Sequence, residues 1–200
     1  MPIEKVVTRH GNEIAYDVEG EGPWITLSHS LASNMSAWDP QLSLLASHFK
    51  VLRFDTRGHG LSSAPADPYN LEDLAQDVCD LFASLGIEKT HWIGLSMGGM
   101  IGQTLILQYP DLFHSLVLAD TTSKRPENAK KMWGERIAQA KADWKAGLFD
   151  KVAGDEIEFL MDDGNAGAPH LDGRSHAEVD EGVHVPAFLA GDVRLYVEAL

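Results

Sequence analysis

The sequence predicts an α/β fold in which a mostly parallel sheet is wound with helices on both faces. Short apolar runs at 24–28, 51–54 and 90–95 have the length of buried strands, and segments with the 3.6-residue period of a helix separate them. This alternation is typical of βαβ units, whose crossover helices cover both faces of a parallel sheet. With 200 residues, 44% of them hydrophobic, the chain is long enough to bury a core of its own.

The N-terminal part of the chain predicts an antiparallel hairpin. "IEKVVT" and "EIAYDVEG" have strand-like composition, and the turn "RHGNE" between them contains a glycine. The glycines of "EGEG" at 19–22 end the second strand. We therefore expect two antiparallel strands before the parallel part of the sheet begins.

Helices and strands then alternate along the chain. "MSAWDPQLSLLASHF" (35–49) predicts the first helix, between the strands at 24–28 and 51–54. A second helix is predicted between an N-cap at Asn70 and a stop at Gly86, because five apolar residues share one of its faces. These five are Leu71, Leu74, Val78, Leu81 and Leu85.

A third helix is predicted beyond the strand at 90–95. It covers 97–109 and is ended by Pro110, and a further strand follows at 114–120. Together with the preceding elements, these segments complete a regular series of strands and helices.

The pattern changes after Thr121. A charged amphipathic helix at 125–147 is expected to lie over the sheet, whereas the following acidic, glycine-rich segment has turn chemistry and little periodicity. A strand is expected at 183–191, and 193–200 has the pattern of either a closing helix or a strand. The chain thus divides into a core (1–120), a cap-like helix with the acidic segment (121–182), and a further core strand with the chain end (183–200).

Charge and composition exclude several classes of partner. The chain carries 16 basic and 30 acidic residues, and the resulting net charge of −14 repels phosphate backbones and anionic membranes. No apolar stretch approaches the roughly 20 residues of a membrane span, and no signal-peptide core is present, so we expect a cytoplasmic protein. The single cysteine, Cys79, supports neither a disulfide framework nor a zinc site, and no cofactor is expected.

The segment "HWIGLSMGGMIGQ" contains the candidate nucleophile. Gly94-Leu95-Ser96-Met97-Gly98 matches the pattern G-x-S-x-G, with a predicted strand before it and a predicted helix after it. In that context the serine occupies a strained turn above the sheet edge, where bulky neighbours would not fit. The alternative is a glycine-rich turn used only for packing. The following helix would offer its positive N-terminal end to an oxyanion beside Ser96.

A loop after the strand at 24–28 is the candidate second half of an oxyanion hole. Backbone N–H groups of Leu31, in "LSHSLASN", and of Met97 are the expected donors. His29 is expected to brace this loop through hydrogen bonds. In the next loop, "FDTRGHGLSS", we expect Asp55 and Arg57 to lock the backbone, and His59 to be structural.

These segments resemble the α/β-hydrolase superfamily, and within it most closely the 3-oxoadipate enol-lactonases. The resemblance rests on "RFDTRGHGLS", "HWIGLSMGGMIGQ", "YPDLFHSLVLADT" and "SHSLASNMSAWDPQLSLLASHFKV" and covers about residues 1–145. It implies cofactor-free hydrolysis by a Ser-Asp-His triad, an eight-stranded sheet and a helical cap after the sixth strand. Related esterases, perhydrolases and carbon–carbon bond hydrolases share much of this sequence. One departure is Ser30, where the family usually has a glycine after the histidine.

The C-terminal part departs from the family pattern, in which the acid follows the seventh strand and the histidine the eighth. "HVPAFLAGDVR" resembles the seventh strand, with Asp192 near the acid position, and Asp120 is at the site used by other superfamily branches. "AGAPHLDG" around His170 resembles the histidine loop, although it precedes that strand. We expect the C-terminal part to be shortened or atypical and no histidine to reach Ser96; if one does, His170 is the candidate base.

The sequence therefore leads to one main hypothesis and two alternatives. The main one is a serine hydrolase that acts on a small carboxylic ester or lactone through an acyl-enzyme on Ser96. One alternative is a non-catalytic member of the fold that binds a ligand without a complete triad. The other is a cofactor-free perhydrolase or carbon–carbon bond hydrolase. The oligomeric state, homo-oligomers included, stays open.

Overall fold

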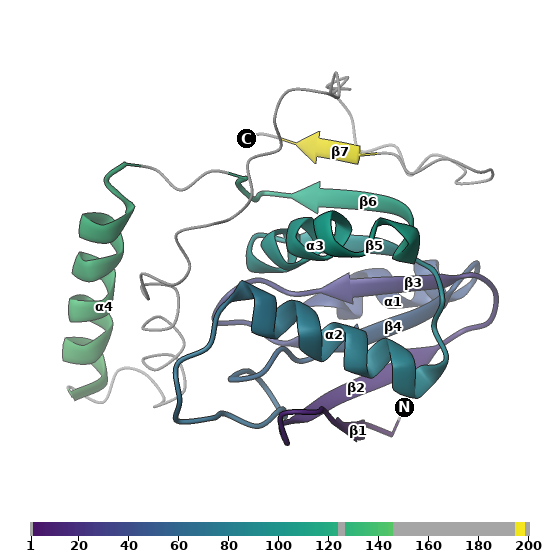
Figure 1. Ribbon diagram of the computed structural model, residues 1–200, viewed down its shortest axis with the longest axis horizontal. Helices are drawn as coiled ribbons and strands as arrows, with labels where there is room; N and C mark the ends of the chain where they lie inside the picture. The colour runs from purple at the N-terminus through teal and green to yellow at the C-terminus, as the bar shows by residue number, and fades with distance from the viewer. Residues whose placement is uncertain (1, 124–126, 146–194, 199–200) are drawn as a thin grey trace.

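The described elements form one seven-stranded sheet with helices on both faces (Figure 1). The computed structural model describes residues 2–123, 127–145 and 195–198. In chain order the elements are β1 (Glu4–Val7), β2 (Glu13–Glu19), β3 (Trp24–Ser28), the 3-10 helix η1 (Met35–Trp38), α1 (Asp39–Ala46), β4 (Lys50–Phe54), α2 (Leu71–Leu85), β5 (Thr90–Leu95), α3 (Met97–Gln108), the 3-10 helix η2 (Pro110–Leu112), β6 (Phe113–Ala119), α4 (Ala129–Lys145) and β7 (Leu195–Glu198). This confirms the predicted fold class.

The sheet is mostly parallel, with an antiparallel edge. Its strand order is β1-β2-β4-β3-β5-β6-β7. β1 pairs antiparallel with β2, as the hairpin prediction required, and β2 pairs antiparallel with β4. The remaining neighbours are parallel. Because parallel strands share a direction, β3, β5 and β6 all end at the same edge, which we call the carboxyl edge.

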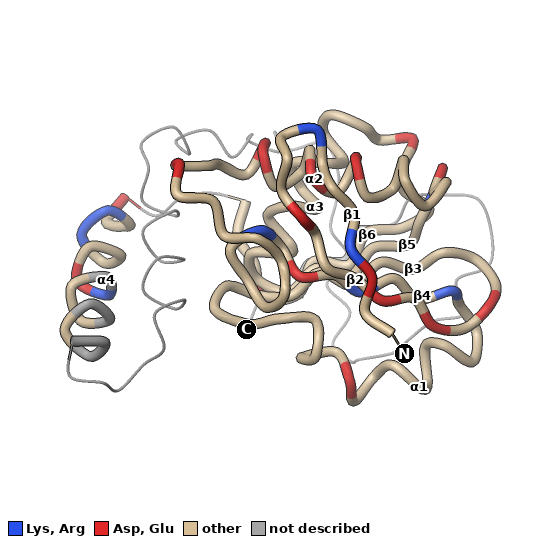
Figure 2. The backbone as a smooth tube through the Cα atoms, turned by 90° about the horizontal axis from the view of Figure 1, so that it is seen from below, with Lys and Arg blue, Asp and Glu red and all other residues tan. Residues whose placement is uncertain are grey.

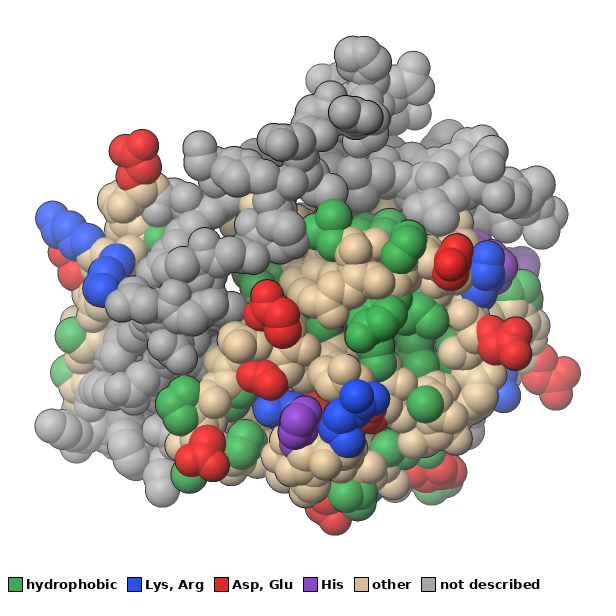
Figure 3. Space-filling view, viewed as in Figure 1, with side chains coloured by type: hydrophobic (Ala, Val, Ile, Leu, Met, Phe, Trp, Pro, Cys, Tyr) green, Lys and Arg blue, Asp and Glu red, His purple; other side chains and the backbone are tan. Residues whose placement is uncertain are grey.

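Two apolar layers hold the helices on the sheet. The larger cluster lies on the face that carries α2 and α3, and its fully buried members include Leu81, Trp92 and Ile101. The smaller cluster, which contains Leu27 and Leu45, lies under α1 on the opposite face. Apolar side chains also remain visible at the surface over α2 and α3 (Figure 3). Burial on both faces explains why the parallel strands are short apolar runs.

α2 has the boundaries that its sequence predicts. The Asn70 side chain accepts a hydrogen bond from the backbone N–H of Asp73, whose carboxylate accepts from the backbone N–H of Asn70. Gly86 ends the helix in the left-handed conformation, at φ 65°. A side-chain cap at Asn70 and the backbone freedom of Gly86 therefore determine the two ends of this helix.

The segment 35–49 does not form the single helix that its period predicts. A 3-10 turn covers Met35–Trp38, and α1 begins at Asp39 with a proline in its first turn. Proline lacks a backbone N–H and fits only the first turn of an α-helix, so the helical path restarts before Pro40.

The later elements agree with the sequence in part. Leu195–Glu198 forms β7, parallel to β6, which selects the strand alternative for 193–200. α4 forms within the predicted helix, but it stands beyond the carboxyl edge and not over a face of the sheet (Figures 1 and 2). The strand predicted at 183–191 and most of the acidic segment lie outside the described residues.

Charge is distributed over the described core without one dominant patch (Figure 2). Among the described residues, no helix has the length and apolar character needed to cross a bilayer. The same part of the chain holds no group of three or more His, Cys, Asp or Glu side chains arranged for a metal ion.

Candidate active site

Ser96 occupies a strained turn between β5 and α3. Its backbone angles are φ 51° and ψ −108°, a region that costs a non-glycine residue about 1–3 kcal/mol. Hydrogen bonds to the adjacent chain hold it there: Ser96 N donates to Ala119 O at 2.8 Å, and Thr121 Oγ1 donates to Ser96 O at 2.7 Å. The strained strand-to-helix turn predicted from the sequence is therefore present.

The glycines around Ser96 are required by close backbone contacts. A Cβ on Gly94 would lie 2.3 Å from the carbonyl oxygen of Gly98, and a Cβ on Gly98 would lie 2.3 Å from that of Ser28. Real Cβ atoms do not approach backbone oxygens this closely. The two glycines thus let the first turn of α3 pack directly on β3 and β5.

The N-terminus of α3 provides a polar environment beside Ser96. Met97 is the first residue of the helix, and it is buried. Backbone N–H groups in the first turn of a helix have no acceptor within the helix, and they carry the positive end of its dipole. The N–H of Met97 therefore belongs to the group of donors that can stabilise negative charge next to Ser96.

Backbone strain concentrates at the carboxyl edge. Within the described residues, the non-glycine residues with positive φ are Ala32 (54°), Ser96 (51°) and Asp120 (45°). Each follows the end of one of three neighbouring strands, β3, β5 and β6. Strained backbone persists only where the surrounding structure holds it, and such positions cluster at functional sites. In open α/β sheets this edge is also where ligands bind.

His29 braces the loop that carries Leu31. Its Nδ1 lies 2.7 Å from Ser30 O, and its Nε2 accepts a hydrogen bond from Thr56 N at 3.0 Å. The ring is fully buried, and this burial lowers the pKa of His29 from 6.5 to about 4. The bracing role predicted for His29 agrees with these contacts.

The loop after β4 is locked to its surroundings. Asp55 accepts hydrogen bonds from Met35 N at 2.7 Å and from Leu61 N at 2.8 Å. Arg57 forms a buried ion pair with Asp77 of α2, with N–O distances of 2.5 and 2.6 Å. The locking roles predicted for Asp55 and Arg57 are therefore observed.

Sequence reasoning missed two supporting residues. Asp77 lies three residues after Leu74, so it is an acid on the apolar face of α2, and that position is a signal of a buried ion pair. Thr121, which holds the Ser96 backbone, carries no comparable signal because the contact joins the segments that follow β6 and β5.

The structure describes one of the three candidates for acid and base. Asp120 is exposed at the end of β6, and both of its sequence neighbours, Ala119 and Thr121, hydrogen-bond to the Ser96 backbone. Asp192 and His170 lie outside the described residues. His91 is an example of a described histidine that lies away from this edge. Its Nδ1 is 2.8 Å from Ser115 Oγ, near the opposite edge of the sheet.

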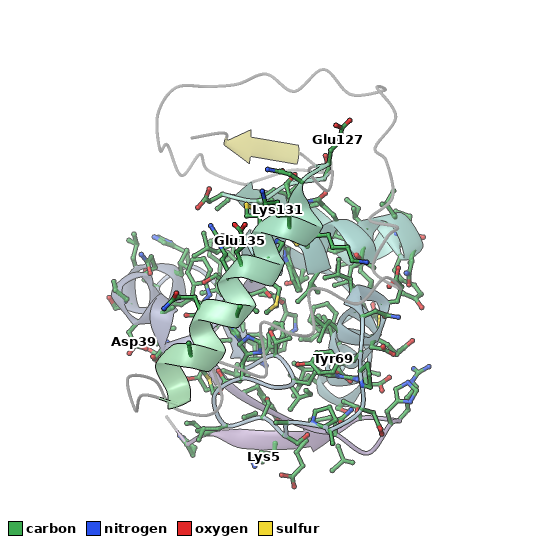
Figure 4. The ribbon with its side chains drawn as sticks, turned by 90° about the vertical axis from the view of Figure 1, so that its left-hand side faces the viewer. Lys5, Asp39, Tyr69, Glu127, Lys131 and Glu135 are labelled. Carbon is green, nitrogen blue, oxygen red and sulfur yellow. The ribbon has the colours of Figure 1, made fainter. Side chains whose placement is uncertain are left out.

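α4 stands in front of the carboxyl edge. Figure 4 looks onto this edge and shows α4, with Lys131 and Glu135, crossing before the sheet. This is the side of the sheet at which β5 ends, directly before Ser96. A helix in this place can contribute a wall to a site above Ser96.

A strained serine between a parallel strand and a tightly packed helix, at the edge where three strands end, defines a class of α/β enzymes. The chain belongs to the α/β-hydrolase fold family, whose model matches residues 23–166.

Individual relatives agree with this assignment. Two 3-oxoadipate enol-lactonases of Acinetobacter baylyi are similar to the chain: enol-lactonase 2 is 37% identical over 53% of this chain and 40% of its own length, and enol-lactonase 1 is 33% identical over 78% and 58%. The crystal structure of the enol-lactonase from Burkholderia xenovorans LB400 has a TM-score of 0.66 and 37% identity, and the match covers 72% of this chain and 56% of that one. The chain spans about half the length of the curated relatives it matches.

Proposed function

We propose that the protein is a serine hydrolase of small carboxylic esters or lactones. The observation that carries the proposal is Ser96, held with positive φ at the N-terminus of α3 by contacts from the end of β6 and from Thr121 beyond it. A turn of this kind exposes the hydroxyl to a substrate and places helix N–H groups beside it. The family is one of hydrolases of small molecules, as the relatives' names indicate.

In the proposed mechanism, the Ser96 hydroxyl attacks the substrate carbonyl and forms an acyl-enzyme, which water then hydrolyses. The N–H groups of Met97 and Leu31 stabilise the oxyanion of each tetrahedral intermediate. A histidine accepts the Ser96 proton and passes it to the leaving oxygen, and a carboxylate orients that histidine. His170 is the candidate base, and Asp120 and Asp192 are the candidate acids.

The proposed substrate class is a small enol-lactone or a short-chain ester. Two similar proteins carry the name 3-oxoadipate enol-lactonase, and one similar crystal structure is described as an enol-lactonase. Lactones and esters present the same kind of acyl carbon to a serine, so one site can hydrolyse both. Other relatives are named putative carbamate hydrolases, and a carbamate therefore belongs in the substrate panel.

Ser96→Ala tests the nucleophile. We expect it to abolish hydrolysis of p-nitrophenyl acetate and of 3-oxoadipate enol-lactone, because loss of a serine nucleophile costs about a million-fold in kcat. A fluorophosphonate probe should label the unaltered protein and not the variant. Ser84→Ala is a matched control, since that hydroxyl lies on α2 and donates to Asp80 O at 2.9 Å. The far-ultraviolet circular dichroism should be the same for all three proteins.

The same experiment separates the alternatives. Retention of more than about a hundredth of the activity in Ser96→Ala would remove Ser96 from the mechanism. An unlabelled but folded wild-type protein would support the non-catalytic ligand-binding alternative. Ester-dependent formation of a peracid, or cleavage of a diketone, would instead support the perhydrolase or carbon–carbon bond hydrolase.

A further inference from the structure

We infer that His29 and His59 are positioning residues that hold two consecutive peptide groups of the oxyanion loop through their neutral rings. This inference rests on the proposed function, because it concerns the direction of the Leu31 N–H. The two rings lie next to each other, with centroids 5.1 Å apart and planes tilted by 53°. Each ring contacts the backbone of the loop after β3 and also the backbone of the loop after β4.

His29 holds the peptide group that contains the Leu31 N–H. Its Nδ1 lies 2.7 Å from Ser30 O, and a carbonyl oxygen only accepts, so Nδ1 carries the proton. The Ser30 carbonyl and the Leu31 N–H belong to one planar trans peptide group. A ring that fixes the direction of the carbonyl therefore also fixes the direction of the N–H, which points the opposite way in the same plane.

His59 holds the next peptide group. Its Nε2 lies 3.3 Å from Ala32 N, and its Nδ1 lies 3.1 Å from Arg57 O. An N–H only donates and a carbonyl only accepts, so Nδ1 again carries the proton and Nε2 accepts. Ala32 has φ 54°, a conformation that needs external support in a residue other than glycine. The hydrogen bond from its N–H to His59 is such support.

Both rings fulfil these roles only when they are neutral. Each Nε2 accepts from a backbone N–H, and protonation would place a second donor against that N–H. Burial lowers the pKa of each ring to about 4, and the neighbouring His29 ring further lowers the pKa of His59. The charged groups nearest to the two rings have hydrogen-bond partners elsewhere. Asp55 accepts from two backbone N–H groups, and Arg57 pairs with Asp77.

Substitutions at His59 provide the test. His59→Leu removes both ring nitrogens, whereas His59→Gln keeps an amide oxygen that can accept from the Ala32 N–H. We expect His59→Leu to lower kcat for p-nitrophenyl acetate about tenfold with little change in KM, because loss of an oxyanion donor altogether costs about a hundredfold or more. His59→Gln should restore most of kcat. His91→Leu is the matched control near the opposite edge of the sheet, and it should reduce stability without lowering kcat.

A second measurement does not depend on activity. Hydrogen exchange of the Ala32 amide should be slow in the wild-type protein, faster in His59→Leu and slow again in His59→Gln. Unchanged exchange in His59→Leu overturns the inference, whether or not the wild type hydrolyses esters. An equal loss of kcat in His59→Leu and His91→Leu also overturns it, since that result would reflect general destabilisation. If exchange follows the expected order while Ser96 is not labelled by a fluorophosphonate, the proposed function fails and the histidine contacts to the loop are upheld.

If His59→Leu does not fold, His29→Asn provides the same distinction. Asn keeps a short amide donor in place of Nδ1, which can reach Ser30 O, but its amide oxygen lies too close to the backbone to replace Nε2 as the acceptor for the Thr56 N–H. We expect this variant to retain more of kcat than His29→Leu. Equal kcat values for the two variants would contradict the role assigned to the Nδ1 proton.

Discussion

The backbone of Gly98 lies so close to β3 that one methyl group decides whether α3 can pack there. A Cβ added to Gly98 would lie 2.3 Å from Ser28 O. The Cβ is fixed by the helix backbone and the oxygen by the strand backbone, so neither atom can rotate away. Ser96, two residues earlier, depends on this packing for its position above the sheet. At the scale of single residues, the position of the candidate nucleophile thus depends on the lack of a side chain at Gly98 as well as on Ser96 itself.

Gly98→Ala should destabilise the protein by about 1–3 kcal/mol, the usual cost of forcing extra atoms into a packed interior. Gly134→Ala is the matched control. Gly134 is exposed on α4, and a Cβ there would meet nothing within 4 Å. An alanine at that position should be neutral or stabilising by up to about 1 kcal/mol. Urea unfolding measures both changes. Equal midpoints for the two variants would show that the turn can accommodate a methyl group at position 98.

Asp120→Asn tests the candidate acid that the structure describes. Asn is the appropriate replacement because it tolerates positive φ and removes only the charge. If Asp120 orients the catalytic histidine, kcat should fall by about a thousandfold to ten-thousandfold with the fold intact. Steady-state kinetics of Asp120→Asn and Asp192→Asn should be compared directly. A loss confined to Asp192→Asn would assign the acid to the C-terminal segment instead.

At the scale of elements, α2 connects the locked loop after β4 to the core. Its buried Asp77 pairs with Arg57, while its apolar face contributes Leu74, Leu81 and Phe82 to the larger cluster. The helix is also capped at both ends by the residues that flank it, Asn70 and Gly86. Its position therefore depends on local capping, on apolar burial and on one ion pair.

Asn70→Ala should lower the free energy of unfolding by about 1 kcal/mol, because it removes the side-chain half of a reciprocal cap. Asn70→Ser retains an oxygen acceptor and should recover most of this loss. Thermal or urea unfolding monitored by circular dichroism provides the comparison. Identical stabilities for the alanine and serine variants would indicate that the capping hydrogen bond contributes nothing to stability.

At the scale of the whole molecule, the buried histidines connect stability to pH. The pKa of both His29 and His59 is lowered from 6.5 to about 4, chiefly by burial. Between these two values the unfolded chain binds protons at both rings and the folded chain does not. The contribution of the pair is therefore fully present above about pH 6.5 and is lost progressively as the pH falls toward 4.

We expect each ring to add about 1.4 kcal/mol per pH unit to the slope of the unfolding free energy near pH 5. Urea unfolding at pH 7, 6 and 5 measures this slope. His59→Gln should reduce it by about the contribution of one ring, and His91→Leu, which alters a less buried histidine, should reduce it less. An unchanged slope in His59→Gln would mean that His59 is protonated in the folded protein.

The sequence by itself determined the elements and the candidate nucleophile. Apolar period and length identified the strands at 24–28, 51–54 and 90–95, because parallel strands are buried on both faces. The motif around Ser96 identified a strained turn, because the requirement for small neighbours is local to the chain. Asn70 and Gly86 likewise marked the ends of α2 through contacts within one turn.

The tertiary structure alone decided what depends on contacts between distant segments. Strand order places β4 between β2 and β3, and no local period carries that information. The hydrogen bonds of His59 to Ala32 and of Thr121 to Ser96 join loops 25 or more residues apart. The acid and base stay predictions because their positions relative to Ser96 depend on the same kind of long-range packing. A period in the sequence reports which side of an element is buried, and only packing decides which partner it is buried against.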